Sequence, residues 1–365
     1  MLILFLVSAT AIAILSLLPL SASEKWWVRC MDFPRLQLAA TTFSLFCAAL
    51  FCLPLGQLTS LVVIAITVSL LVYQLWWIAP YSRFFPVEVQ WSRSKNPDNA
   101  IRILSANVLT TNRNAQPFID LVDANTPDVV LTLESDSWWE RQLAVLENKL
   151  PHTVKVPLDN LYGMHLYSRY PLSETEVKYL VEKDVPSVHT LIEMPSGVSV
   201  RAHFVHPAPP SPTENETSQE RDAELILIAK SLQNAKVPTI VAGDLNDVAW
   251  SATTRLFRRI SGLLDPRIGR GLLNTFHANF WFLRWPLDHI FHSQAFTLSD
   301  IRRLPKFGSD HFAIFTELHY SPDIDEDGSC LHTRDKDEDW AEQKLDVTEA
   351  NPTDVPEPGA ANAVL

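Results

Sequence analysis

The sequence predicts an α/β domain of two packed β-sheets with helices outside, preceded by three membrane-spanning helices. Three uncharged apolar runs occupy residues 1–80. From residue 101 onward, segments with strand-like alternation and segments with helical spacing follow one another, and the stretches 160–206 and 285–318 contain successive strands. Such a mixture is typical of sheets that pack face to face and are covered by helices.

The apolar runs are residues 2–20, 37–55 and 58–79, and none contains a charged residue. Each has about the 20 residues that a helix needs to cross a hydrocarbon core roughly 30 Å thick. None shows the polar stripe of a helix that packs on a soluble core. A cleaved signal peptide is the weaker alternative for the first run, because no Lys or Arg precedes it and two further spans follow. Aromatic rings that favour the headgroup zone lie at the ends of the runs: Trp26, Trp27, Trp76 and Trp77.

Charges beside the runs predict which side of the membrane holds the rest of the chain. The first loop contains Lys25, Arg29 and Arg35, whereas the second loop at residues 56–57 has no charge. Two crossings separate the first loop from the long remaining segment, so both lie on the same side. The positive-inside rule slightly favours the cytoplasm for that side, and we expect an integral protein of a bacterial inner membrane.

After the membrane segment we expect a linker at 81–98, one folded domain at 99–320 and an acidic tail at 321–365. Prolines and serines interrupt any regular pattern in the linker. Within the domain, helices are expected at 115–125 and 216–233. Strands are expected at 101–107, 128–134, 197–206, 237–243 and 312–318.

The acidic tail carries most of the net charge of −12, with three Lys/Arg against 13 Asp/Glu. We therefore expect it to be disordered. Residues 323–328 begin like a calcium-binding loop with Asp323, Asp325 and Asp327, but Arg334 stands where such a loop requires a bidentate Glu.

The segment 93–320 is nearly neutral, with 23 Lys/Arg and 26 Asp/Glu. It lacks the basic excess of proteins that grip duplex nucleic acid. A local basic cluster at Arg255, Arg258 and Arg259 is expected to be a solvated helix face. The four cysteines, at positions 30, 47, 52 and 330, show neither a metal-binding spacing nor a disulfide framework.

Polar residues recur at the ends of the predicted strands. Each of them alone is more often a cap or turn residue, but residues at the same end of neighbouring strands converge in space. Clustered oxygen ligands suit a hard cation such as Mg²⁺, or Mn²⁺, which binds phosphate. The sequence therefore predicts a phosphoryl-transfer site. Its members are Asn107, Glu134, His206, Asp244, Asn246, Asp288, Asp310 and His311.

Several short motifs occur in a fixed order between residues 99 and 320. They are S-A-N at 105–107, L-E at 133–134, Y-S-R-Y-P-L at 167–172, H-P-A-P at 206–209, G-D-L-N-D at 243–247, L-D-H-I-F at 287–291 and G-S-D-H at 308–311. With these motifs the segment resembles the endonuclease/exonuclease/phosphatase superfamily, in a membrane-anchored, bacterial-type form. The resemblance implies a four-layer sandwich of two mixed sheets flanked by helices.

The resemblance also implies a metal side of the site. Glu134 would ligate the metal, Asn107 beside it would hold metal-bound water or phosphate, and Asp310 would be a further carboxylate on that side.

The other five residues would carry the reaction. Asp244 would bind or activate the attacking water, Asn246 would orient the scissile phosphate, and His206 would contact phosphate. His311 would act as general base or stabilise the charged phosphorane, and Asp288 would hold its ring. Whether Asp244 or His311 takes the water proton stays open.

The resemblance implies a hydrolase of phosphodiester or phosphomonoester bonds, acting on nucleic acid or on a phospholipid or inositol phosphate. A catalytically inactive, membrane-tethered binding or scaffold protein is the alternative. A transporter is excluded because the spans contain no charge. The aromatic segment 276–286 could stack a base, cover a lipid or pack internally. Besides the lipid bilayer and this substrate, the sequence predicts no particular partner.

Overall fold

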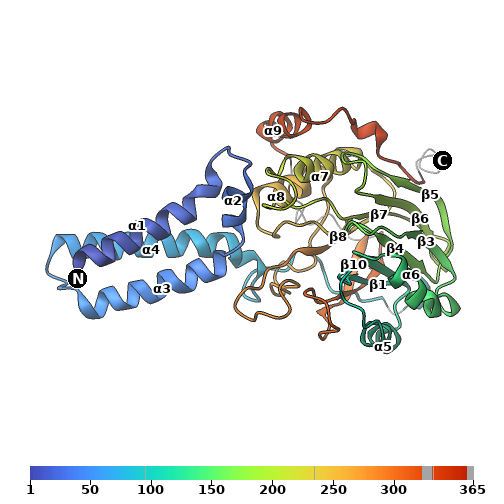
Figure 1. The fold of residues 1–365 in the computed structure, drawn as a ribbon, viewed down its shortest axis with the longest axis horizontal. Helices are drawn as coiled ribbons and strands as arrows, with labels where there is room; N and C mark the ends of the chain where they lie inside the picture. The colour runs from blue at the N-terminus through green and yellow to red at the C-terminus, as the bar shows by residue number, and fades with distance from the viewer. Residues whose placement is uncertain (95, 234, 323–330, 332, 360–365) are drawn as a thin grey trace.

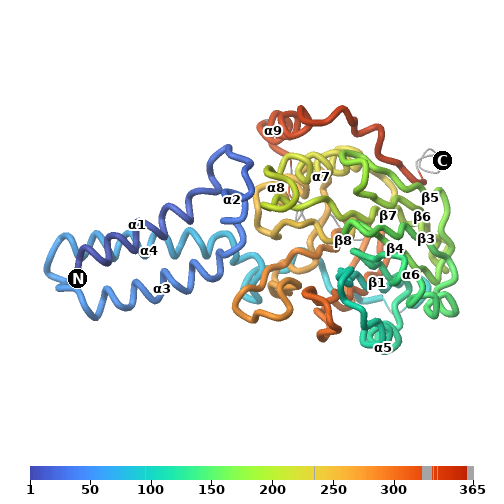
Figure 2. Tube along the Cα trace, viewed as in Figure 1, coloured from blue at the N-terminus to red at the C-terminus, as the bar shows by residue number. Residues whose placement is uncertain are grey.

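The computed structural model describes residues 1–94, 96–233, 235–322, 331 and 333–359. The chain forms a helical bundle beside a two-sheet domain (Figure 1). The bundle consists of α1 (Leu2–Leu17), α3 (Arg35–Cys52) and α4 (Leu58–Ile78). The N-terminus lies at the end of the bundle remote from the domain, so α1 runs toward the domain, α3 away from it and α4 back (Figure 2).

All three bundle helices are long and apolar enough to cross a membrane. A small core at the end remote from the domain includes Phe5, Ala49 and Val63. Many of the outward-facing side chains are large and apolar, such as Phe51, which is 89% exposed, and Val72, which is 60% exposed. Such an exterior suits hydrocarbon better than water. Trp26, Trp27, Trp76 and Trp77 lie in α2 (Trp26–Arg29) and in the last turn of α4, near the domain.

The domain contains two mixed sheets. The six-stranded sheet has the order β10-β11-β1-β2-β4-β3, and the five-stranded sheet has the order β5-β6-β7-β8-β9. The first comprises β10 (Phe296–Arg303), β11 (Ile314–Tyr320), β1 (Ala100–Asn107), β2 (Val129–Leu133), β4 (Met164–Ser168) and β3 (His152–Val156). The second comprises β5 (Leu172–Lys178), β6 (Ser187–Glu193), β7 (Ser199–Val205), β8 (Thr239–Asp244) and β9 (Asp288–His292).

Side chains from both sheets meet in one core, exemplified by Ile103 and Leu131 of the first sheet and Phe204 and Ile240 of the second. The helices α5 (Gln116–Asn125) and α6 (Ser137–Leu143) cover the outer face of the six-stranded sheet. The helices α7 (Gln219–Ser231) and α8 (Ala252–Ser261) cover the five-stranded sheet. The predicted four-layer sandwich is therefore confirmed, and each predicted strand and helix lies within about two or three residues of an observed one.

The prediction that Arg255, Arg258 and Arg259 form a solvated face of α8 is wrong. Arg258 is buried and forms an ion pair with Glu88, whose other oxygen accepts from the Asp265 amide at 2.7 Å. Arg259 binds Asp337 at 2.7 Å, and Arg255 lies over the Trp77 ring at 4.8 Å. Glu88 belongs to the segment 81–98, which contains no α-helix or strand in its described part but packs along the domain. A buried guanidinium needs such a partner, and the partner lies 170 positions away in sequence.

The tail also differs from the expected disorder where the structure describes it. Residues Asp335–Leu345 form α9, which lies along α7 and α8 (Figure 1). Ala341 and Val355 are buried against these helices, and Lys344 binds Asp222 of α7 at 2.7 Å. Two acidic residues of the tail, Asp337 and Glu338, pair with Arg259 and Lys230 of the domain, which partly neutralises the acidic charge that suggested disorder. The acidic run 323–328 lies outside the described residues.

Glu224 on α7 is a buried carboxyl that destabilises the fold at neutral pH. Burial, and then the charge of Glu182, raise its pKa to about 8, and its Oε1 atom has no hydrogen-bond partner among the described residues. The unfolded chain releases this proton near pH 4.3, whereas the folded chain keeps it until about pH 8. Between these values the folded state binds more protons, so stability falls as pH rises.

We therefore expect Glu224→Gln to raise the stability of the full chain at pH 8 by at least about 1 kcal/mol and to change it little at pH 4. Denaturant unfolding in detergent micelles at both pH values measures the difference. The exposed Glu193→Gln is the matched control and should change neither value. An equal effect of Glu224→Gln at both pH values would contradict the titration of this carboxyl.

Candidate active site

The predicted site residues lie where strand ends of the two sheets meet. Strands β1 and β2 run parallel, with Asn107 paired to Leu133, and Glu134 follows directly. In the other sheet β7 and β8 run parallel, and Asp244 pairs with Asp288 at the start of the antiparallel β9. The two strand pairs bring their polar ends together across the core.

Gly243 fixes the position of the neighbouring Asp244. Its φ is 152°, and a Cβ atom there would lie 1.8 Å from the carbonyl oxygen of Val205 on β7. Only glycine allows this close approach between β7 and β8. The glycine of the G-D-L-N motif is therefore required by backbone packing, which places the Asp244 carboxylate at the strand end.

Asn107 joins the two sheets at the site. Its Nδ2 atom donates to Glu134 Oε1 at 2.7 Å and lies 3.4 Å from Asp244 Oδ2. Its Oδ1 atom accepts from the Leu109 amide at 3.1 Å, which fixes the orientation of the carboxamide. Both Glu134 and Asn246 have left-handed backbones, with φ of 56° and 50°. Such strain in residues other than glycine is typical of functional sites.

Glu134 has an incomplete set of partners. Burial raises its pKa to about 7, against the hydrogen bond from Asn107 and the charge of His311, which lower it. Its Oε2 atom is buried and has no hydrogen-bond partner in the described part of the chain. Asp310 lines the same cavity. A carboxylate oxygen without a partner beside a second carboxylate and a carboxamide fits a hard divalent cation.

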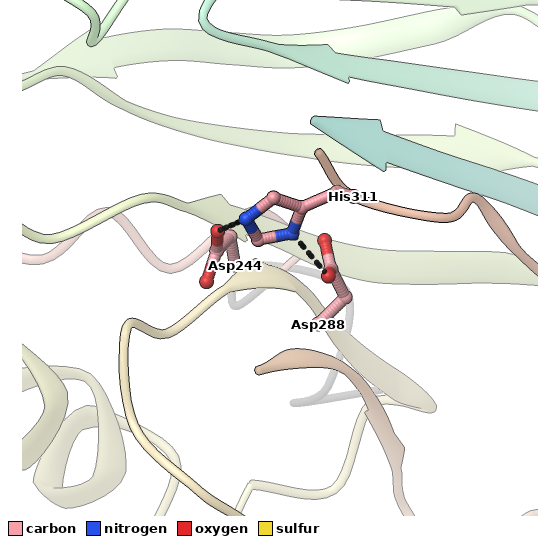
Figure 3. A group of neighbouring side chains, drawn as sticks. All are labelled: Asp244, Asp288 and His311. Carbon is pink, nitrogen blue, oxygen red and sulfur yellow. Dashed lines mark hydrogen bonds and ion pairs between the residues drawn. The ribbon is translucent and has the colours of Figure 1, made fainter. Parts of the chain in front are cut away.

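His311 lies between two carboxylates (Figure 3). Its Nδ1 atom is 2.8 Å from Asp288 Oδ2, and its Nε2 atom is 3.5 Å from Asp244 Oδ2. Burial alone would lower the pKa of His311, but the carboxylates of Asp288 and Asp244 outweigh burial and raise it to about 10. The ligand atoms of these three residues lie within 4.8 Å of one another and could hold a metal ion. Because both ring nitrogens already face carboxylates, we infer that the imidazolium itself is the cation at this point.

His206 and Asn246 complete the group. His206 Nε2 lies 3.9 Å from Asp244 Oδ2, and its ring packs at 5.4 Å from that of Tyr162. Burial lowers the pKa of His206 to about 4, so the ring is neutral at pH 7. The side-chain amide of Asn246 donates to the Pro207 carbonyl at 3.0 Å, and the backbone carbonyl of Asn246 accepts from Arg221 at 2.9 Å. All eight predicted residues therefore lie together.

The site opens into a cavity of about 270 Å³, whose wall includes two residues of the first loop that the sequence did not indicate and one residue of the aromatic segment. Cys30 and Phe33 belong to the first loop between α1 and α3, and Phe276 belongs to the aromatic segment. The first loop is fixed to the domain, because Trp250 donates to the Asp32 carbonyl at 2.7 Å and Trp26 donates to that of Glu216 at 2.9 Å. The sequence contains one indication that the first loop could line the cavity: the loop and the domain are expected on the same side of the membrane.

Three further histidines, His189, His203 and His289, are buried in the domain away from the cavity wall. His289 contacts Arg267 at 2.6 Å and the Asp247 carbonyl at 2.9 Å. His189 and His203 contact each other at 2.7 Å. Tyr167 packs beneath α5 and α6, whereas Tyr162 packs against His206 at the site.

Comparison with solved structures identifies similar folds. Humanized TDP2 of D. rerio superposes with a TM-score of 0.51 at 19% identity, covering 60% of this chain and 99% of that one. The catalytic domain of human Nocturnin with a bound sulfate anion has a TM-score of 0.51 at 17% identity, covering 61% of this chain and 95% of that one. At these identities the likeness shows the fold alone. A comparison with curated proteins found no match.

The family model described as "Endonuclease/Exonuclease/phosphatase family" matches residues 104–311. The matched range is more than half of the chain, and all eight polar residues described above lie within it. By this match and by its two-sheet fold, the chain belongs to the endonuclease/exonuclease/phosphatase family.

Proposed function

We propose that the chain is a membrane-anchored hydrolase of phosphoester bonds that depends on Mg²⁺ or Mn²⁺. The observation that carries the proposal is the convergence of eight polar side chains, five of which line one cavity, while Glu134 Oε2 has no hydrogen-bond partner in the described part of the chain. No site position has been lost, so the inactive scaffold protein finds no support. We further propose that the three apolar helices span a bacterial inner membrane with the domain on the cytoplasmic side, as the charges of the first loop favour.

Glu134, with Asn107 and Asp310 beside it, would hold the metal ion. A divalent cation held by these residues would supply Lewis-acid polarisation of a phosphate oxygen and positive charge against the charge that develops in the reaction. The carboxamide of Asn107 keeps Glu134 and Asp244 at a fixed separation through its contacts with both. These three residues thus form the metal side of the proposed site.

On the other side of the cavity, Asp244 accepts a proton from the attacking water. The water oxygen forms a bond to phosphorus, and the bond between phosphorus and the leaving oxygen breaks. Asp288 holds His311 through Nδ1, so that Nε2 is directed toward Asp244 and the cavity, where its charge stabilises the phosphorane. Asn246 and the neutral His206 contact the phosphate oxygens.

Glu134→Gln removes the charge of the proposed ligand while keeping its size and its acceptor for Asn107. We expect Mn²⁺ affinity of the full chain to fall at least about tenfold, with a matching loss of turnover of bis(p-nitrophenyl) phosphate. Electron paramagnetic resonance titration measures free Mn²⁺ independently of activity. The exposed Glu176→Gln, on β5, is the control. If Glu134→Gln bound Mn²⁺ as tightly as the wild type, Glu134 would not be a metal ligand.

His311→Ala removes the cation between Asp288 and Asp244. We expect kcat to fall by about 10²–10⁴-fold, because a positioned proton-transferring or charge-stabilising group contributes that much. Asp288→Asn should cause a smaller loss, since it removes only the partner that orients the ring. His319→Ala, at the far end of β11, is the control. A His311→Ala rate within a few-fold of the wild type would remove His311 from the mechanism.

A further inference from the structure

The aromatic segment 276–286 has an exposed apolar tip. Four consecutive residues are exposed there: Phe280 by 48%, Trp281 by 79%, Phe282 by 52% and Leu283 by 37%. Single exposed apolar side chains are common on soluble proteins, but a contiguous run of large ones marks an interaction surface. The packed part of the segment is its base, where Phe276 stacks on Trp285.

This tip lies beside the proposed membrane helices. Gln37, in the first turn of α3, donates to the Phe282 carbonyl at 2.8 Å. The orange segment accordingly lies next to the domain-side end of the blue bundle (Figure 2). The exposed Trp27 and Trp76 also lie at this end of the bundle. Aromatic residues at one level along a set of spans indicate the headgroup zone of a bilayer.

The base of the same segment reaches the active site. Phe276 lines the cavity, and its ring lies 4.9 Å from that of His311. Trp285 contacts Phe33 of the first loop at 5.7 Å, edge to face, and Phe33 lines the cavity as well. The Ala278 amide donates to the Asp310 carbonyl at 2.6 Å. The segment 276–286 therefore contacts the first turn of α3 at its tip and contacts His311 and Asp310 at its base.

We propose that the tip 280–283 inserts into the bilayer interface and that the site takes its phosphoester from a lipid headgroup in the same membrane. This proposal rests on the proposed function and specifies its substrate class. Insertion of the tip would bring the cavity, whose wall includes Phe33 of the first loop and Phe276, close to the lipid headgroups. A substrate then reaches the metal side and His311 without leaving the bilayer.

The alternative substrate, a single-stranded nucleic acid, would need a basic groove along its backbone in addition to aromatic rings for stacking. Residues 276–286 contain one cation, Arg284, and this guanidinium lies over the Phe312 ring at 5.1 Å. The domain as a whole has no basic excess. The observations therefore favour the lipid.

Photocrosslinking tests the insertion without any activity. The full chain, carrying benzoylphenylalanine in place of Trp281, is reconstituted in nanodiscs of phosphatidylcholine and phosphatidylglycerol and irradiated. We expect lipid adducts by mass spectrometry. The same substitution at Val145, which is 51% exposed after α6 on the other side of the domain, should give none. Absence of adducts at position 281, or equal adducts at 145, would overturn the insertion.

Turnover then tests the substrate class. Full-length protein is reconstituted with Mg²⁺ in proteoliposomes whose own bilayer contains phosphatidylcholine, sphingomyelin and phosphoinositides, and parallel samples of the same proteoliposomes are given single-stranded DNA or bis(p-nitrophenyl) phosphate. We expect lipid hydrolysis. The Trp281→Ser, Phe282→Ser double variant should lower the ratio of lipid turnover to bis(p-nitrophenyl) phosphate turnover at least about tenfold, because it removes two large apolar contacts with the bilayer. Val145→Ser should leave the ratio unchanged.

The outcomes separate this inference from the proposed function. Cleavage of DNA or of bis(p-nitrophenyl) phosphate with no lipid turnover overturns the lipid substrate and leaves the phosphoesterase standing. Failure to hydrolyse any of the probes overturns both. Lipid turnover whose ratio does not change in the double variant overturns the role of the tip.

Discussion

The excess of negative charge at the meeting point of the two sheets is the constraint on which the site depends. The carboxylates of Glu134, Asp244 and Asp288 are largely buried there, and one imidazolium, that of His311, faces two of them. An uncompensated buried charge is strongly unfavourable, so the remaining carboxylate either keeps its proton or binds a cation. Burial, with smaller contributions from Asp310 and Asp244, raises the pKa of Glu134, and its Oε2 atom has no hydrogen-bond partner in the described part of the chain; a bound cation would compensate both. In our account the missing charge is a divalent metal ion.

The fold places this deficit at the end of the domain that contacts the helical bundle. Parallel strand pairs in both sheets direct their polar ends to one region, and Gly243 lets β7 and β8 approach closely enough to aim Asp244 at it. The first loop then adds Cys30 and Phe33 to the wall, held by the hydrogen bond from Trp250 to the Asp32 carbonyl. The loop between α1 and α3 thus contributes to the wall of the candidate cavity, and in our proposal the substrate lies in the lipid beside it.

Much of the fold and of the site can be predicted from the sequence because the information is local. Alternation and apolar runs locate the strands, and polar residues that directly follow them, such as Asn107 and Asp244, share an edge. Contacts between distant segments carry no such local pattern. The pairing of Glu88 with Arg258 and of Lys344 with Asp222, and the approach of Phe33 to the cavity, depend on how separate elements pack. For this reason the sequence predicts a solvated guanidinium where Arg258 is buried, and a disordered tail where α9 packs on α7 and α8.

Anomalous diffraction from crystals of the full chain grown with Mn²⁺ tests the central claim most directly, because it locates the metal without reference to any substrate. The account predicts one manganese peak bonded to the carboxylate of Glu134 and lying against Asn107 or Asp310. A peak found only among Asp244, Asp288 and His311, or no peak anywhere in the cavity, would contradict it.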